Sequence, residues 1–293
     1  MKQNKTSWYK IMNMFFLLAA VCFLGGVLRE CVQNEWQIAV DGRQIILRIL
    51  LCLVCFVILH MAKCLRFYLV LMEQRIQFGR FVRMYLKTTF VNFLLPMKSG
   101  ELYRIYCFAH ETKNVSIGFV SVILDRILDT CVLLLFLVPY DLIVAHEISI
   151  VTIILTLIVF VVGAGCVFLY SSYGYLNRFL MIHGTSKRTI YLLQILEHLK
   201  MCYDYTAGLL KGRFMLILVF SCIGWIFEFL FLKIMAGIFS IEFQTAQFAE
   251  YIGGIFSSDT GMLKNGYVVI SALGLLLAIL LAFVGKRRRS GKC

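Results

Sequence analysis

The stretch from residue 148 to residue 170 contains no charged side chain. A run of about 20 apolar residues is long enough to cross the hydrocarbon core of a bilayer as a helix. Only helices and closed barrels satisfy every backbone polar group in that environment. A barrel would show short segments of alternating polarity, and this sequence shows none. The chain is therefore predicted to be an all-α integral membrane protein.

Composition supports the same class, because the 293 residues are 61% hydrophobic and only 15% charged. A soluble domain of this size carries about a quarter charged residues. The first apolar run is longer than the core of a signal peptide and lacks a small-x-small cleavage site, so it is interpreted as a span. With the stretch at 148–170, five other runs predict about six transmembrane helices: 11–28, 45–62, 117–138, 214–238 and 267–284.

The basic residues indicate how the chain is oriented. Most of the 29 Lys and Arg residues lie in four alternate segments: 1–10, 63–113, 171–213 and 285–293. Cytoplasmic loops collect such residues, so both termini are predicted to be cytoplasmic. The net charge of +13 is explained in the same way, and no nucleic-acid partner is expected. The tail at 285–293 is interpreted as a topology anchor.

Two connecting segments are too apolar for ordinary loops. Residues 81–106 begin and end on the cytoplasmic side, so they are predicted to form a re-entrant hairpin. Residues 243–261 are predicted to form a second hairpin from the outer face. The units 45–138 and 214–284 then run in opposite directions, an inverted-topology arrangement that recurs in transporters. Residues 186–210 are predicted to form an amphipathic cytoplasmic helix within this single membrane domain, residues 1–293.

The first predicted hairpin contains the most specific pattern of the sequence. Pro96 has no N–H group and should end the first half-helix, with Asn92 one turn earlier positioned to bind a freed backbone group. Ser99 is expected to cap the second half-helix, and Gly100 to permit a tight turn. The N-terminus of that half-helix would favour phosphate or carboxylate, and Lys98 and Arg104 are nearby in the sequence.

A second group of charges lies on the following span. Asp125 and Asp129 fall on one helical face, while Arg126 points away from Asp125. Arg104 or Lys98 is expected to pair with one of the two aspartates, and Arg126 with Glu101 or with an anionic head group. Glu228 is expected to pair with Lys233 or with a basic residue of the first half. An alternative stays open, in which these pairs only hold the hairpin against the span.

These residues resemble a known family. Asn92, Pro96, Gly100, Glu101 and Arg104, followed by the sequence from Asp125 to Asp129, are similar to the lysylphosphatidylglycerol synthase transmembrane domain family, also called the flippase-like domain. Leu94-Leu95 and Arg66-Phe67 also fit its pattern. The resemblance covers residues 45–140 well. It departs at 257–266, where the family has a Pro/Gly-rich motif with an acid and this sequence has no proline and only Asp259.

The resemblance implies a bacterial or archaeal protein of the cell (plasma or inner) membrane that handles a lipid in cell-envelope biogenesis. No soluble aminoacyl-transferase domain is recognised, so lysyl transfer is not expected. The leading hypothesis is a flippase-like protein for a phosphate-bearing lipid, either a phospholipid or a polyprenyl-linked glycan precursor. The predicted head-group ligands are Lys98, Ser99, Gly100, Arg104 and Arg126. The predicted charge-pairing or proton-coupling groups are Glu101, Asp125, Asp129 and Glu228, and the predicted helix break involves Asn92 and Pro96.

Other functions remain as alternatives. The chain could be a non-transporting accessory subunit of a membrane glycosyltransferase or polysaccharide pathway, and the altered second hairpin favours that reading. An enzymatic function is not expected, because the sequence shows no catalytic Ser-His-Asp set, no nucleotide loop and no metal-ligand cluster. No cofactor and no metal are predicted. The expected partners are membrane lipids with an anionic head group and a glycosyltransferase or aminoacyl-transferase, and homo-oligomerisation is left open.

Overall fold

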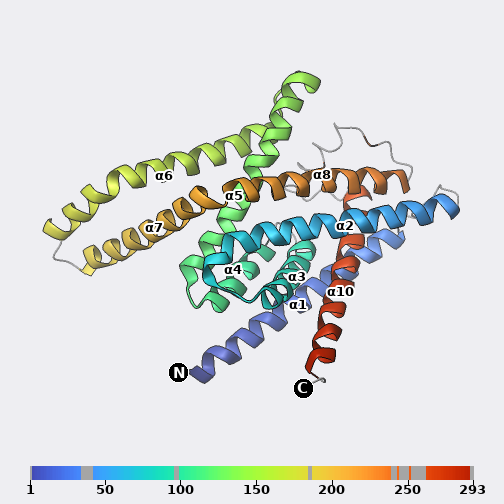
Figure 1. Ribbon diagram of the computed structural model, residues 1–293, viewed down its shortest axis with the longest axis horizontal. Coiled ribbons are helices and arrows are strands. Elements are labelled where there is room, and N and C mark those ends of the chain that lie inside the picture. Colours follow the sequence, from blue (N-terminus) through green and yellow to red (C-terminus); the bar gives the residue numbers. More distant parts are fainter. Residues whose placement is uncertain are drawn as a thin grey trace.

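The computed structural model describes residues 2–33, 42–95, 99–183, 187–238, 243, 251 and 262–290. The ordered elements of this part of the chain are helices, and no strand occurs in it (Figure 1). The helices are α1 (Lys2–Gln33), α2 (Gly42–Leu71), α3 (Phe78–Leu94), α4 (Gly100–Thr112), α5 (Val115–Tyr140), α6 (Ile150–His183), α7 (Lys187–Gly212), α8 (Phe214–Ile238) and α10 (Met262–Ser290). A short 3-10 turn, η1 (Met72–Gln74), and a π-helical turn, η3 (Asp141–Ala145), extend α2 and α5.

The apolar runs of the sequence coincide with helices of the fold. Among the described residues, three helical segments are long and apolar enough to cross a membrane: Ile45–Gln74, Ile150–Phe168 and Phe214–Ile238. Two shorter apolar segments, Ile11–Gly26 and Gly266–Ala282, lie on α1 and α10. The all-α membrane class is therefore supported. The six crossings and the re-entry of two hairpins into the bilayer stay predictions.

The helices α2 and α8 form the central pair of the bundle and run antiparallel along their whole length (Figure 1). Near one end of the pair, Arg48 donates a hydrogen bond to the carbonyl oxygen of Gly237. Nearer the other end, Lys63 contacts Glu228. Glycine at position 237 leaves the room that the Arg48 guanidinium occupies, since a Cβ there would lie 3.0 Å from its Nη1. The Arg48 side chain therefore reaches a backbone group of α8 where that helix has no side chain in the way.

The segment predicted as the first hairpin is a pair of helices and not one continuous crossing. The helix α3 ends at Leu94, Leu95 is extended with ψ of 134°, and α4 begins at Gly100. The two helices pack on each other, and α4 packs in turn on α5. The connection to α5 is capped by Asn114, whose side chain accepts hydrogen bonds from the backbone N–H groups of Ser116 at 3.0 Å and Ile117 at 3.4 Å. Such a cap satisfies donors that have no partner within the helix.

The helices α6 and α7 form a long antiparallel pair beside the central bundle (Figure 1). Tyr170 and Tyr203 stack between them with ring centroids 5.3 Å apart. The predicted amphipathic helix at 186–210 coincides with α7, but its predicted apolar face is only partly buried. Leu196 is 8% exposed, whereas Leu192 is 49% exposed. The location of α7 along the inner membrane surface stays a prediction.

Candidate functional site

Arg66, near the C-terminal end of α2, is the centre of a group of buried charges. Its side chain is 1% exposed. Its Nε donates to Oδ1 of Asp125 at 2.8 Å, and its Nη1 donates to Asp129. Nη1 also donates to Oγ of Ser221 on α8 at 2.9 Å. The two aspartates lie on one face of α5, as their spacing predicted, so one guanidinium group joins α2, α5 and α8.

Arg104 on α4 and Arg126 on α5 complete the group. Nη1 of Arg104 lies 3.7 Å from Oδ2 of Asp125 and 3.8 Å from Oε2 of Glu101, distances that permit ion pairing but exceed hydrogen-bond lengths. Arg126 lies 3.2 Å from Glu101 through Nε and 3.2 Å from Asp125 through Nη2. Both residues therefore make one of the pairings expected for them. We call Arg66, Glu101, Arg104, Asp125, Arg126 and Asp129 the charge cluster, and its three guanidinium groups balance its three carboxylates.

The two arginines predicted to hold a head group differ in accessibility. The Arg104 side chain is 4% exposed, and its guanidinium lies over the rings of Phe67 at 4.1 Å and Tyr85 at 5.5 Å. The Arg126 side chain is 36% exposed although it touches three carboxylates. Arg104 is therefore enclosed by protein, and Arg126 is the cation of the charge cluster that a ligand can reach.

The residues at the helix break behave differently from the sequence interpretation in three respects. Asn92 donates through Nδ2 to Oε1 of Glu101 at 2.9 Å, and among the described residues its side chain bonds no backbone group. Ser99 occupies the N-cap position of α4, but its side chain makes no capping hydrogen bond because its backbone is already helical. Gly100 has no positive φ. It is required for close approach, since a Cβ there would lie 2.7 Å from the backbone nitrogen of Asn92.

Four buried polar atoms gather between the helix break and Arg126 without a hydrogen-bond partner among the described residues. They are Oδ1 of Asn92, Oε2 of Glu101, Nε of Arg104 and Nε of Arg126. The atoms of Glu101, Arg104 and Arg126 lie near opposite charges, but their distances or angles do not fit hydrogen bonds. An unsatisfied buried polar group costs about 1–3 kcal/mol, so such groups are usually satisfied by water, an ion or a ligand. The combination of two donors and two acceptors is suited to a hydrated or protonatable oxyanion.

Glu228 on α8 belongs to a second buried ion pair. Its partner is Lys63 on α2, whose Nζ lies 2.6 Å from Oε2. Of the two partners expected for Glu228, the basic residue of the first half is therefore the one observed. Lys233 is exposed on another face of α8. The hydroxyl groups of Tyr251 and Tyr267 donate to Oε1 of Glu228 at 3.2 Å and 3.3 Å. Both oxygens of this carboxylate are therefore satisfied.

Both ion groups lie deep along their helices. At about 1.5 Å per residue, Asp129 and Glu228 are each about 21 Å from the first residue of α5 and α8. Those helices contain 26 and 25 residues. Charged side chains in the middle of a membrane span are costly, and they usually face one another or a cavity. Breaking a buried pair by removing one partner costs about 3–5 kcal/mol.

Comparison with known proteins identifies the family of the chain. The sequence model of the family described as "Lysylphosphatidylglycerol synthase TM region" matches residues 10–263. The chain belongs to this family. No curated protein and no solved structure matches the chain. The match extends well beyond residues 45–140, where the motifs resemble the family, and includes the first unit and residues 214–263 of the second.

Within this member of the lysylphosphatidylglycerol synthase TM family, sequence reasoning missed the residues that organise the site. Arg66 and Lys63 were placed in a cytoplasmic connection because the second span was expected to end at residue 62. The helix continues to Leu71, since the next residues are again mainly apolar. That continuation was the signal available in the sequence. The acids on α5 and α8 neutralise both cations, and so these can stay inside the bundle.

Two predicted site residues lie outside the described residues. They are Pro96 and Lys98, and most of the predicted second hairpin at 243–261 also lies outside them. Phe243 and Tyr251 are described from that hairpin, and Tyr251 contacts Glu228. Within the part of the chain that the structure describes, no group of three or more His, Cys, Asp or Glu side chains is placed to hold a metal ion.

Proposed function

We propose that this membrane protein binds a phosphate-bearing lipid at the break between α3 and α4 and moves it between the leaflets of the cell membrane. One observation carries the proposal: three buried polar atoms without a hydrogen-bond partner among the described residues lie near Arg126, whose own Nε also lacks one and whose side chain is partly exposed. A ligand that fits this site supplies oxygen atoms and a negative charge. A phosphate diester or monoester does both.

The head group is held by Arg126 together with the first turn of α4. The first N–H groups of a helix lack partners within that helix, and its N-terminus carries a partial positive charge, so the first turn of α4 favours an anion. Arg126 already contacts Glu101, so the phosphate takes the place of this carboxylate and Glu101 takes up a proton. The charge of the cluster stays balanced in that exchange. Asp125 and Asp129 keep the arginines oriented and do not contact the guest.

Movement across the membrane uses the two halves of the chain. The halves meet mainly along α2 and α8, where the contacts include the Lys63–Glu228 ion pair, the Arg66–Ser221 hydrogen bond and the packing of Phe56 on Phe231. Inverted repeats that rock about such a site provide alternating access in transporters. The acyl or prenyl tails stay in the bilayer, so only the head group requires a polar route. Neither half performs bond chemistry in this proposal, and the chain acts as a carrier with cytoplasmic termini.

A second function is favoured by the charge balance of the cluster. Three cations already paired with three carboxylates form a stable scaffold without any guest. In that alternative the chain is a non-transporting subunit that holds a membrane glycosyltransferase or aminoacyl-transferase. The two functions differ in whether the isolated protein moves lipid.

A reconstituted vesicle assay separates them. The purified chain is placed in vesicles that contain fluorescent phosphatidylglycerol or a labelled polyprenyl phosphate, and an impermeant reductant reports the outer-leaflet fraction. The wild-type protein is expected to expose inner-leaflet label, and Arg126→Gln to abolish this. Arg178→Gln, which removes an exposed cation on α6, is the matched control and should behave as wild type. Unchanged sidedness with the wild-type protein, or equal rates for Arg126→Gln, would reject the carrier function.

A further inference from the structure

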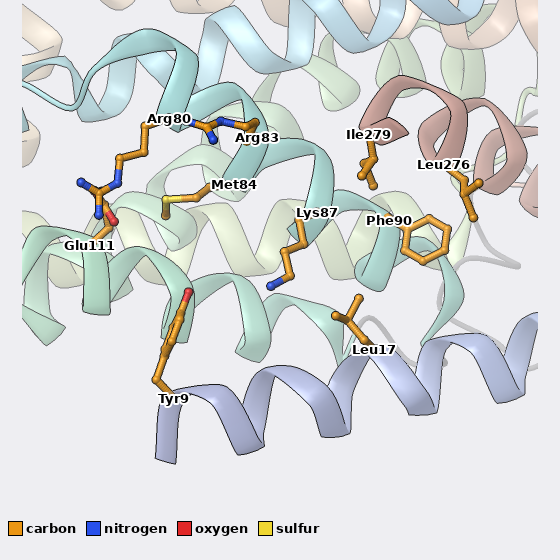
Figure 2. Close-up of a pocket in the computed structure, with 10 residues that line it drawn as sticks. All are labelled: Tyr9, Leu17, Arg80, Arg83, Met84, Lys87, Phe90, Glu111, Leu276 and Ile279. Atoms are coloured by element: carbon orange, nitrogen blue, oxygen red, sulfur yellow. The ribbon is translucent and has the colours of Figure 1, made fainter. Parts of the chain in front are cut away.

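A cavity of about 800 Å³ lies between α1, α3, α4 and α10, away from the charge cluster (Figure 2). It is polar at one end, where Arg80, Arg83 and Lys87 line it with Tyr9 and Glu111, and apolar at the other. The apolar end is formed by Leu17, Phe90, Leu276 and Ile279. Figure 2 shows the basic side chains following one another along α3 toward the apolar end.

The polar end carries positive charge that the protein does not neutralise. Arg80 is paired with Glu111 at 2.7 Å. Arg83 donates through Nε to the carbonyl oxygen of Gly79 in its own helix, at 3.1 Å. Lys87 donates to the neutral side chain of Asn13 on α1. Neither Arg83 nor Lys87 therefore has an acidic partner among the described residues, and the cavity keeps two net cations.

The dimensions of the cavity match one leaflet of a bilayer. Arg80 and Phe90 are about 15 Å apart along α3 at 1.5 Å per residue. That is about half of the ~30 Å hydrocarbon thickness. The basic ends of α1 and α10 predict that the polar end of the cavity faces the cytoplasm. A ligand that fills the cavity needs an anionic group at that boundary and apolar chains beyond it.

We propose that this cavity binds an anionic glycerophospholipid of the cytoplasmic leaflet, with the phosphate between Arg83 and Lys87 and an acyl chain along Leu17, Phe90 and the α10 side chains. A soluble phosphate would leave the apolar end wet, and a neutral lipid would leave two cations unpaired. The site is distinct from the charge cluster, because α3 turns a different face, that of Tyr85 and Asn92, toward α4 and Arg104. It does not depend on lipid movement by the protein.

Lipid binding to the full chain in nanodiscs or detergent tests the proposal. The probes are phosphatidylglycerol and phosphatidylcholine with identical acyl chains, and retention is read by native mass spectrometry or by titration of a fluorescent analogue. The double variant Arg83→Gln/Lys87→Gln is expected to lose roughly 30-fold in affinity for phosphatidylglycerol, since each basic group near a membrane surface contributes about fivefold. Its affinity for phosphatidylcholine should not change.

The matched control is Lys113→Gln/Arg178→Gln, which removes two exposed cations outside the cavity and should bind phosphatidylglycerol as the wild type does. A second variant, Ile279→Trp, fills the apolar end and should also lose binding without any change of charge. Soluble glycerol phosphate should not compete with the lipid at millimolar concentration. Full competition would mean that the cavity binds a free phosphate compound and not a lipid, which would overturn the proposal. Equal affinities in the wild type and both cavity variants would overturn the proposal.

Discussion

Replacing Arg66 by methionine tests whether the charge cluster holds the bundle together. The substitution leaves Asp125 and Asp129 buried without their shared partner, while the side-chain volume is largely kept. The loss of one partner of a buried pair costs about 3–5 kcal/mol. The free energy of unfolding should fall by that amount, because the remaining guanidinium groups contact Asp125 only at 3.7 Å and 3.2 Å.

The measurement is an equilibrium titration with SDS in mixed micelles, followed by tryptophan fluorescence. Trp225 is a suitable reporter, since its Nε1 donates to the backbone oxygen of Asp129 at 3.3 Å. Substituting Trp8 and Trp36 by phenylalanine leaves it as the sole tryptophan of the chain. The fluorescence change then reports unfolding close to the charge cluster.

A charge-balanced double variant tests whether Arg66 and Asp129 stabilise the protein as a pair. Arg66→Met combined with Asp129→Asn removes one charge of each sign, so it should be more stable than the sum of the two single changes predicts, by about 0.5–3 kcal/mol. Arg213→Gln is the matched control, because it loses only partly exposed contacts, to Glu73 at 3.7 Å and to the carbonyl oxygen of Leu69 at 3.5 Å, and should cost at most about 1 kcal/mol. A loss below about 1 kcal/mol for Arg66→Met, or strict additivity in the double variant, would refute a cooperative buried cluster.

Two further predictions concern the helix contacts. Glu228→Gln keeps the hydrogen bonds from the two tyrosines but loses the ion pair with Lys63, so unfolding in the same SDS titration should become easier by about 1–3 kcal/mol; no change would mean that the pair contributes nothing. Gly100→Ala places a methyl group 2.7 Å from the Asn92 backbone nitrogen and should separate α3 from α4, lowering both stability and lipid movement. Gly79→Ala has open space around it, so it should be neutral or slightly stabilising, and equal effects of the two alanines would contradict the close-approach argument.

Local patterns in the sequence were sufficient for the class of the protein and for parts of its site. Apolar runs predicted helices that the structure contains, and the spacing of Asp125 and Asp129 predicted their common face. The pattern around Gly100 predicted two helices with a break between them, which the ends of α3 and α4 agree with. Periodicity and helix-breaking residues act over a few positions, so they can be read without knowing how the helices pack.

The tertiary structure decided which charges meet. Arg66 is 59 positions from Asp125 and Lys63 is 165 positions from Glu228, and nothing in the local pattern distinguishes these partners from Lys98 or Lys233. The role of Gly100 also depends on a neighbouring helix and not on its own backbone angles. The lipid-sized cavity forms only where α1, α3, α4 and α10 come together. Burial of a cation is tolerated when an acid from another helix satisfies it, and helix packing alone determines whether that acid is present.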